Sequence, residues 1–102
     1  MAAASHHMTK YGDPECVQKV WETAKPIKGK DPKEFRRDAA GVVIRWSLYG
    51  KQVPGGWQID HIKSKEQGGS DFLKNLQALN WEYNQKKGGS AVKVSRHSKS
   101  NK

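Results

Sequence analysis

Cysteine and long apolar runs are scarce in this 102-residue chain. The one cysteine, Cys16, excludes an intrachain disulfide framework and a structural zinc site built on cysteine pairs. No apolar run approaches the roughly 20 residues that span a bilayer, and no secretory signal pattern precedes the fold. We therefore expect an intracellular protein that is not secreted and has no membrane partner.

Acidic residues are also few, so the chain carries a net positive charge. Asp and Glu number 10 against 19 Lys and Arg, which gives a net charge of +9, while apolar residues make up 34% of the chain. A length of this order allows one domain at most, with a small core. The excess of positive charge favours a polyanionic partner, and nucleic acid is the leading candidate.

The two ends of the chain differ from its middle. Residues 1–9 are interpreted as a tag or a disordered leader, so their histidines are set aside as site candidates. Residues 90–102 contain no acidic residue and are expected to form a flexible basic tail. The folded domain is expected over residues 10–89.

A helix is predicted to begin at Asp13-Pro14, where the aspartate can cap the helix and the proline suits its first turn. Apolar residues then recur at helical spacing, at Val17, Val20, Trp21 and Ala24. Pro26 is expected to end this helix. Cys16 lies within it and is expected to be buried and inert.

The rest of the pattern predicts short strands and a second helix. Residues 35–45 indicate a β-hairpin that turns at 38–41, and 57–62 indicate a further strand. A second short strand is expected over 75–79, and a helix from Asn80 to a Gly-Gly stop. The fold class is therefore a small α+β domain.

The residues that carry chemistry lie between 57 and 88. Asp60 and His61 are adjacent on the strand, Asn75 follows, and Asn84 and Lys87 share one face of the second helix. A histidine can accept a proton from water, and carboxylate and amide oxygens are hard ligands for a divalent metal. Taken singly, each residue has an ordinary alternative: a hydrogen-bonded strand histidine, a turn asparagine, a surface amide or a solvated lysine. Their combination favours a site.

The stretch W-Q-I-D-H-I-K-S-K-E-Q-G-G-S-D, followed by N-L-Q-A-L-N-W-E-Y-N-Q-K-K-G, resembles the HNH endonucleases and their ββα-metal finger. The resemblance covers about residues 57–88. It implies that His61 is the general base, with Asn75 holding the loop and helping to orient it. It also implies that Asp60 and Asn84 bind a metal and that Lys87 lies near the phosphate.

The chain departs from the family pattern at two positions. Asn84 stands where many members carry a histidine, which makes this an H-N-N variant, and Ser64 replaces the usual proline. An amide oxygen shifts the expected metal towards Mg²⁺ or Mn²⁺, with Ni²⁺ or Zn²⁺ as alternatives. Because adjacent strand residues point to opposite faces, Asp60 and His61 can serve one centre only if the strand twists or ends there.

The resemblance implies metal-dependent hydrolysis of DNA phosphodiester bonds with little sequence preference. Double-stranded DNA is the expected partner, and phosphate contacts are expected from basic side chains at Arg36, Arg37, Arg45, Lys63, Lys65, Lys86 and Lys87. Two alternatives stay open: a non-catalytic nucleic-acid-binding module on the same scaffold, and an RNA-directed nuclease. The oligomeric state is not predicted.

Overall fold

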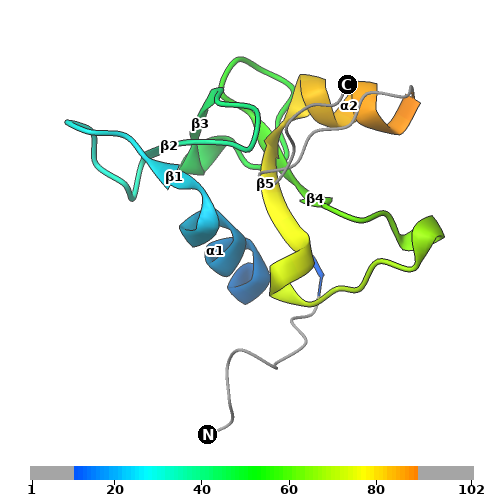
Figure 1. The fold of residues 1–102 in the computed structure, drawn as a ribbon. Helices are drawn as coiled ribbons and strands as arrows, with labels where there is room; N and C mark the ends of the chain where they lie inside the picture. Colours follow the sequence, from blue (N-terminus) through cyan, green and yellow to red (C-terminus); the bar gives the residue numbers. More distant parts are fainter. Residues whose placement is uncertain (1–10, 90–102) are drawn as a thin grey trace, which may run out of the picture.

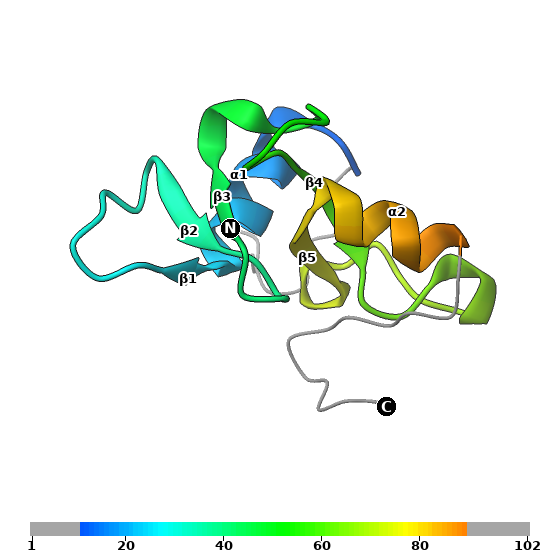
Figure 2. The ribbon, with the colours of Figure 1, turned by 90° about the horizontal axis from the view of Figure 1, so that it is seen from above.

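The computed structural model describes residues 11–89, which form two helices and two small sheets. The elements are α1 (Pro14–Thr23), β1 (Lys25–Pro26), β2 (Phe35–Arg37), β3 (Val43–Arg45), β4 (Trp57–His61), β5 (Leu76–Asn80) and α2 (Trp81–Gly89). The expected leader and basic tail lie outside the described residues. Figures 1 and 2 place β1, β2 and β3 at one end of the molecule and α2 at the other, with β4 and β5 between them. The predicted α+β class is confirmed.

The first helix forms where its sequence pattern predicts, but the Asp13 side chain makes no capping hydrogen bond. Pro14 occupies its first turn, and Cys16, Val17, Val20 and Trp21 are its buried residues. These residues face inward because they recur every three to four positions along the helix. None of the described helices is long and apolar enough to cross a membrane.

The predicted hairpin is part of a three-stranded antiparallel sheet in the order β1-β2-β3. Gly41 takes a φ of 86° in the turn, a conformation that glycine adopts without strain. The sequence did not predict β1, because Pro26 was expected only to end the helix. Proline is tolerated in an edge strand, where its missing N–H costs no ladder hydrogen bond, and β1 is such an edge.

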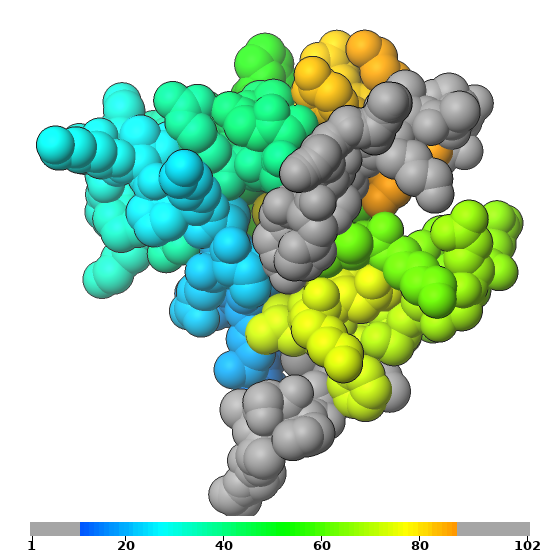
Figure 3. All heavy atoms as spheres, viewed as in Figure 1, coloured from blue at the N-terminus to red at the C-terminus, as the bar shows by residue number. Residues whose placement is uncertain are grey.

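Strands β4 and β5 pair antiparallel, and α2 follows β5 without a connecting loop. The register places Trp57 opposite Asn80 and Asp60 opposite Gln77. The Asn80 side chain accepts a hydrogen bond from the Glu82 backbone N–H at 3.0 Å and so caps the helix. We call β4, β5 and α2, together with the segment 62–75 that joins the strands, the ββα unit. Part of that segment stands out from the body of the molecule (Figure 3).

The core lies between α1 and the two sheets. Ile44, Trp57 and Leu76 are completely buried, and the ring centroids of Trp21 and Trp57 lie 5.3 Å apart. Trp57 is completely buried, whereas Trp81 is only partly buried. These apolar contacts fix the ββα unit against the hairpin and α1.

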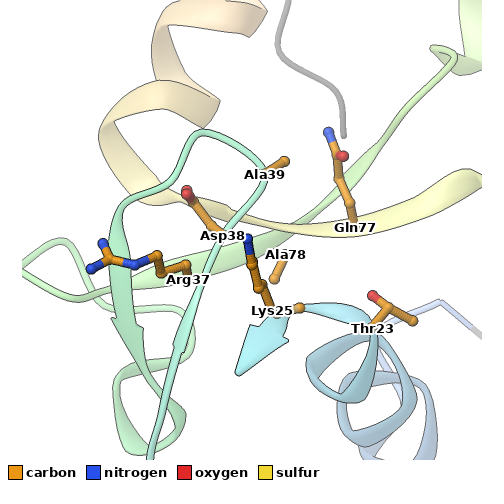
Figure 4. Close-up of a pocket in the computed structure, with 8 residues that line it drawn as sticks. Thr23, Lys25, Arg37, Asp38, Ala39, Gln77 and Ala78 are labelled. Atoms are coloured by element: carbon orange, nitrogen blue, oxygen red, sulfur yellow. The ribbon is translucent and has the colours of Figure 1, made fainter. Parts of the chain in front are cut away.

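A buried carboxylate also joins the two sheets. Asp38 lies in the hairpin turn next to Ala78 of β5 (Figure 4) and is only 6% exposed. Its Oδ1 accepts the backbone N–H groups of Ala40 and Val42, and its Oδ2 accepts that of Asn80 at 2.7 Å. Burial raises the pKa of Asp38, and the three N–H groups oppose that shift. The carboxylate thereby ties the start of α2 to the hairpin.

Candidate active site

The pairing of α2 with β4 creates the candidate site. Gln58 and Asp60 are two positions apart on a strand and so share a face, while Asn84 and Lys87 are three apart on a helix and share a face. The structure brings the two faces together. The Asn84 amide donates to Gln58 Oε1, and Lys87 Nζ donates to Asp60 Oδ2 at 2.6 Å. The shared face of β4 therefore contacts the shared face of α2 through two side-chain hydrogen bonds.

Asp60 is the buried acid of the site. Its side chain is 8% exposed, and its Oδ2 accepts hydrogen bonds from Lys87 Nζ and from Gln77 Nε2 at 2.9 Å. No residue within 11–89 donates to its second oxygen, Oδ1. A buried carboxylate is costly without partners, and here a lysine and an amide compensate it.

Lys87 therefore lies inside the site rather than on the outer surface. Its ammonium side chain is 15% exposed and also donates to the backbone oxygen of His61 at 2.9 Å. It joins the last two residues of β4 to α2. A phosphate contact, the role implied for Lys87, would be made from this position.

His61 ends β4, and its imidazole has partners different from those of Asp60. Its Nε2 lies 2.7 Å from Asp71 Oδ1, and its ring stacks on Tyr11 with centroids 5.0 Å apart and planes inclined by 25°. The strand ends at this residue, as the joint use of both side chains requires.

Asn75 closes the segment that joins β4 to β5. Its Oδ1 accepts the Lys63 backbone N–H at 2.8 Å, and its amide donates to the carbonyls of Lys63 and Ser70. These bonds hold both ends of the 63–70 segment together. The structure shows no direct bond between Asn75 and His61.

The predicted DNA-contacting side chains fall into two groups. Arg36 is engaged inside the fold: its guanidinium donates to the carbonyls of Pro32, Glu22 and Ala24, near the end of α1. Lys87 is partly buried in the site, and the others lie on the exposed surface; they are Arg37, Arg45, Lys63, Lys65 and Lys86. Figure 4 shows the Arg37 side chain pointing away from Asp38 and Gln77.

The donor set fits a hard divalent metal only if amide oxygen takes part. No group of three or more His, Cys, Asp or Glu side chains that could hold a metal occurs within residues 11–89. Asp60 Oδ1 is a buried oxygen that no described group engages. The Asn84 amide nitrogen donates to Gln58, and no residue within 11–89 donates to the Asn84 side-chain oxygen. These two oxygens suit Mg²⁺ or Mn²⁺ better than zinc.

Sequence reasoning missed four contributors to this arrangement, namely Tyr11, Gln58, Asp71 and Gln77. Asp71 stood within the quoted motif, separated from the Gly68-Gly69 pair by Ser70, and that position was the available signal. Tyr11 lies 50 positions from His61, so no local pattern connects the two.

Comparison with known proteins bears on this unit alone. Residues 50–90 match the family described as HNH endonuclease, which is less than half of the chain and includes β4, β5 and nearly all the site. No curated protein matches the chain, and no solved structure does. The resemblance recognised from the motif is confirmed over this segment.

Proposed function

Because residues 50–90 form an HNH endonuclease segment, we propose that this chain hydrolyses DNA phosphodiester bonds in a metal-dependent reaction. The observation that carries the proposal is the packing of α2 on β4. It brings Asn84 and Lys87 against Gln58 and Asp60, beside the histidine that ends the strand. A nuclease needs a base, an acidic ligand and a cation near one phosphate, and this unit contains all three kinds of group.

Asp60 and Asn84 would hold the metal. A divalent cation bound there would polarise the phosphate and stabilise the leaving oxygen. Lys87 Nζ lies 2.6 Å from Asp60 Oδ2 and neutralises this carboxylate. A cation bound to Asp60 would take over that neutralisation, so the ammonium would shift towards the phosphate. Its flexible four-carbon stem permits such a movement.

His61 would remove a proton from the attacking water. A neutral imidazole has one ring nitrogen with a free lone pair, and this atom can accept a proton. The oxygen of the water would attack phosphorus as the 3′-oxygen leaves, giving 5′-phosphate and 3′-hydroxyl ends. Asn75 would support this step by holding the segment that follows the histidine.

Duplex DNA would be bound by exposed positive charge on the hairpin and on the ββα unit. The side chains proposed to contact phosphates are Arg37, Arg45, Lys63, Lys65 and Lys86, with Lys87 at the scissile phosphate. Arg36 was predicted to belong to this set, but its N–H groups already bind three carbonyl oxygens, whereas Arg37 binds one, that of Gly41. Contacts of this kind give affinity that depends on salt and carries little sequence information.

One observation favours a second function, a binding module without turnover. The Asp60 carboxylate is satisfied internally by Lys87 and Gln77, and an amide stands at position 84. A scaffold that had lost its metal could keep such an arrangement and still bind nucleic acid through its charge.

Nicking of supercoiled plasmid by the full chain tests the proposal. Reactions contain Mg²⁺, Mn²⁺, Ni²⁺, Zn²⁺ or EDTA, and a matched RNA duplex is tested alongside. His61→Ala is expected to lower the nicking rate by about 10²–10⁴-fold, the usual contribution of a general base. His97→Ala, a histidine outside the HNH match, is the control and should nick like the wild type. Binding without nicking in every metal would favour the second function, and nicking that persists in His61→Ala would contradict the assigned base.

A further inference from the structure

Asp71 holds the His61 imidazole at one nitrogen. The distance from His61 Nε2 to Asp71 Oδ1 is 2.7 Å, and the other carboxylate oxygen accepts from Lys65 Nζ at 3.1 Å. The histidine side chain is 16% exposed, so this bond is sheltered from much of the solvent. Asp71 lies ten residues beyond the histidine, across the segment that Asn75 closes.

We propose that Asp71 is a positioning residue that fixes His61 in the Nε2–H tautomer and leaves Nδ1 as the atom that accepts the proton of water. The proposal rests on the hydrolytic function proposed above and assigns the base to one nitrogen of the ring.

The chemistry of the carboxylate sets the tautomer. An ionised carboxylate can only accept hydrogen bonds, so a neutral imidazole bonded to it through Nε2 must carry its proton there. The hydrogen bond from His61, and then that from Lys65, hold the pKa of Asp71 below its usual value, which keeps the group ionised at neutral pH. Within residues 11–89, no group makes a hydrogen bond to His61 Nδ1.

Tyr11 restrains the plane of the same ring. Its side chain stacks on the imidazole, and its hydroxyl donates to the Ile59 carbonyl at 3.0 Å, two residues before the histidine. Burial raises the pKa of Tyr11, with smaller contributions from Tyr49 and Asp60, so the hydroxyl stays protonated as a donor. The ring is thus held by its edge at Asp71 and by its face at Tyr11, and this fixes the direction of Nδ1.

The proton balance of the step follows from this tautomer. An O–H bond of water breaks as its oxygen bonds to phosphorus, and the proton passes to His61 Nδ1. The 3′-oxygen leaves with the electron pair of its bond to phosphorus and takes a proton from solvent water. The imidazolium that forms keeps its Nε2–H bond to Asp71, whose negative charge stabilises it without accepting the proton.

Asp71→Asn is the informative variant because Lys65 decides how the new amide turns. Lys65 Nζ can only donate, so the amide oxygen is expected to face it and the amide nitrogen to face His61 Nε2. That nitrogen donates, which favours the Nδ1–H tautomer and removes the lone pair that serves as base. Lys65→Met is the matched control for the tautomer, since it removes a second side-chain partner of Asp71 and keeps the bond to His61.

The test measures the tautomer and the kinetics on the full chain. Nitrogen-15 NMR of the histidine side chains at alkaline pH reports the tautomer, and the signal missing in His61→Gln identifies His61. The wild type and Lys65→Met should show Nε2–H, and Asp71→Asn should show Nδ1–H. For plasmid nicking, Asp71→Asn should lower kcat by about 100-fold while KM changes by less than about 3-fold.

The two readouts separate this proposal from the function on which it rests. A wild-type spectrum with Nδ1–H would overturn the assignment even if the protein nicks DNA. An Asp71→Asn variant that keeps Nε2–H and kcat within about 3-fold of the wild type would overturn it as well. If the wild type shows Nε2–H and Asp71→Asn reverses it, but no DNA or RNA is cut, the tautomer assignment stands and the hydrolytic function fails.

Discussion

The hairpin and the ββα unit each bury an aspartate, and they use it differently. Asp38 accepts hydrogen bonds from backbone N–H groups in both sheets, whereas Asp60 accepts them from the side chains of Lys87 and Gln77. Their exposures are nearly equal, at 6% and 8%. A carboxylate bonded to the backbone can exchange partners only if the fold moves, whereas one bonded to side chains can exchange a lysine for a cation.

The basic residues show the same contrast. Arg36 binds carbonyl oxygens in the half of the molecule that contains the hairpin, while Lys87 binds a carboxylate and a carbonyl in the ββα unit. The charge of Arg36 stabilises the fold, and that of Lys87 assembles a group of mutually bonded side chains. Burial by itself therefore does not locate the site, and the type of partner does.

The largest effect is expected at Asp60. Asp60→Asn should lower plasmid nicking by at least about 100-fold, because the loss of about 3 kcal/mol of transition-state stabilisation reduces a rate by that factor. It should also destabilise the fold by up to about 3 kcal/mol, because the Lys87 ammonium loses its partner. Nicking is measured at a temperature where circular dichroism shows the variant folded. Normal nicking by folded Asp60→Asn would remove Asp60 from the site.

Asp38→Asn should lower the stability of the fold and leave the nicking rate unchanged. The new amide nitrogen would face a backbone N–H, and one unsatisfied buried donor costs about 1–3 kcal/mol. Since about 1 kcal/mol shifts the Tm of a domain this size by about 4–8 °C, thermal denaturation checks the result. Below the lowered Tm the nicking rate should match that of the wild type. If Asp38→Asn lost nicking activity while its Tm stayed unchanged, Asp38 would belong to the site and not to the structural contacts.

The arginines give a smaller effect that separates structure from binding. Arg37→Met should reduce the salt-dependence slope of DNA affinity by about 0.9 if its side chain contacts one phosphate. Arg36→Met should leave that slope unchanged and lower the Tm instead, because it removes donors from the carbonyls of Glu22 and Ala24. Affinity measured across a salt series distinguishes the two. Equal salt-dependence slopes for the two variants would contradict the assignment of Arg37 to DNA binding and of Arg36 to the fold.

The smallest effect concerns the acid stability of the loop. The pKa of Asp71 is lowered in the folded protein, chiefly by the hydrogen bond from His61, so its contribution is present above the ordinary aspartate pKa of 3.8. It is lost as the pH falls through the folded value. The difference in unfolding free energy between the wild type and Asp71→Asn should therefore shrink when chemical denaturation is repeated from about pH 6 down to about pH 2. A difference that stays constant would place the stabilising contact elsewhere.

Much of this arrangement could be predicted from the sequence, because its patterns are local. Helical spacing located α1, turn residues located the hairpin, and the strand expected over 57–62 is β4, which ends at His61. The bonding of Asn75 across its loop also has a recognisable local origin.

The rest depended on contacts between segments that are distant in sequence. Tyr11 reaches His61 only after α1 packs on β5, and Asp71 reaches it only after the segment between the strands closes. Arg36 resembled a DNA contact because the chain is basic, and no local signal showed that it would bind the end of α1. Composition indicates the class of partner, but the fold decides which cations remain on the surface.

The double variant Asp60→Asn/Lys87→Gln tests whether the Asp60 carboxylate is needed for catalysis and not only for folding. It replaces the buried ion pair with two neutral amides that can still bond to each other, so it separates the loss of charge from the loss of folding. We expect the Tm of the double variant to rise from that of Asp60→Asn towards the wild-type value. We also expect its nicking rate to stay at least about 100-fold below that of the wild type. A folded double variant that nicks plasmid at the wild-type rate would contradict it.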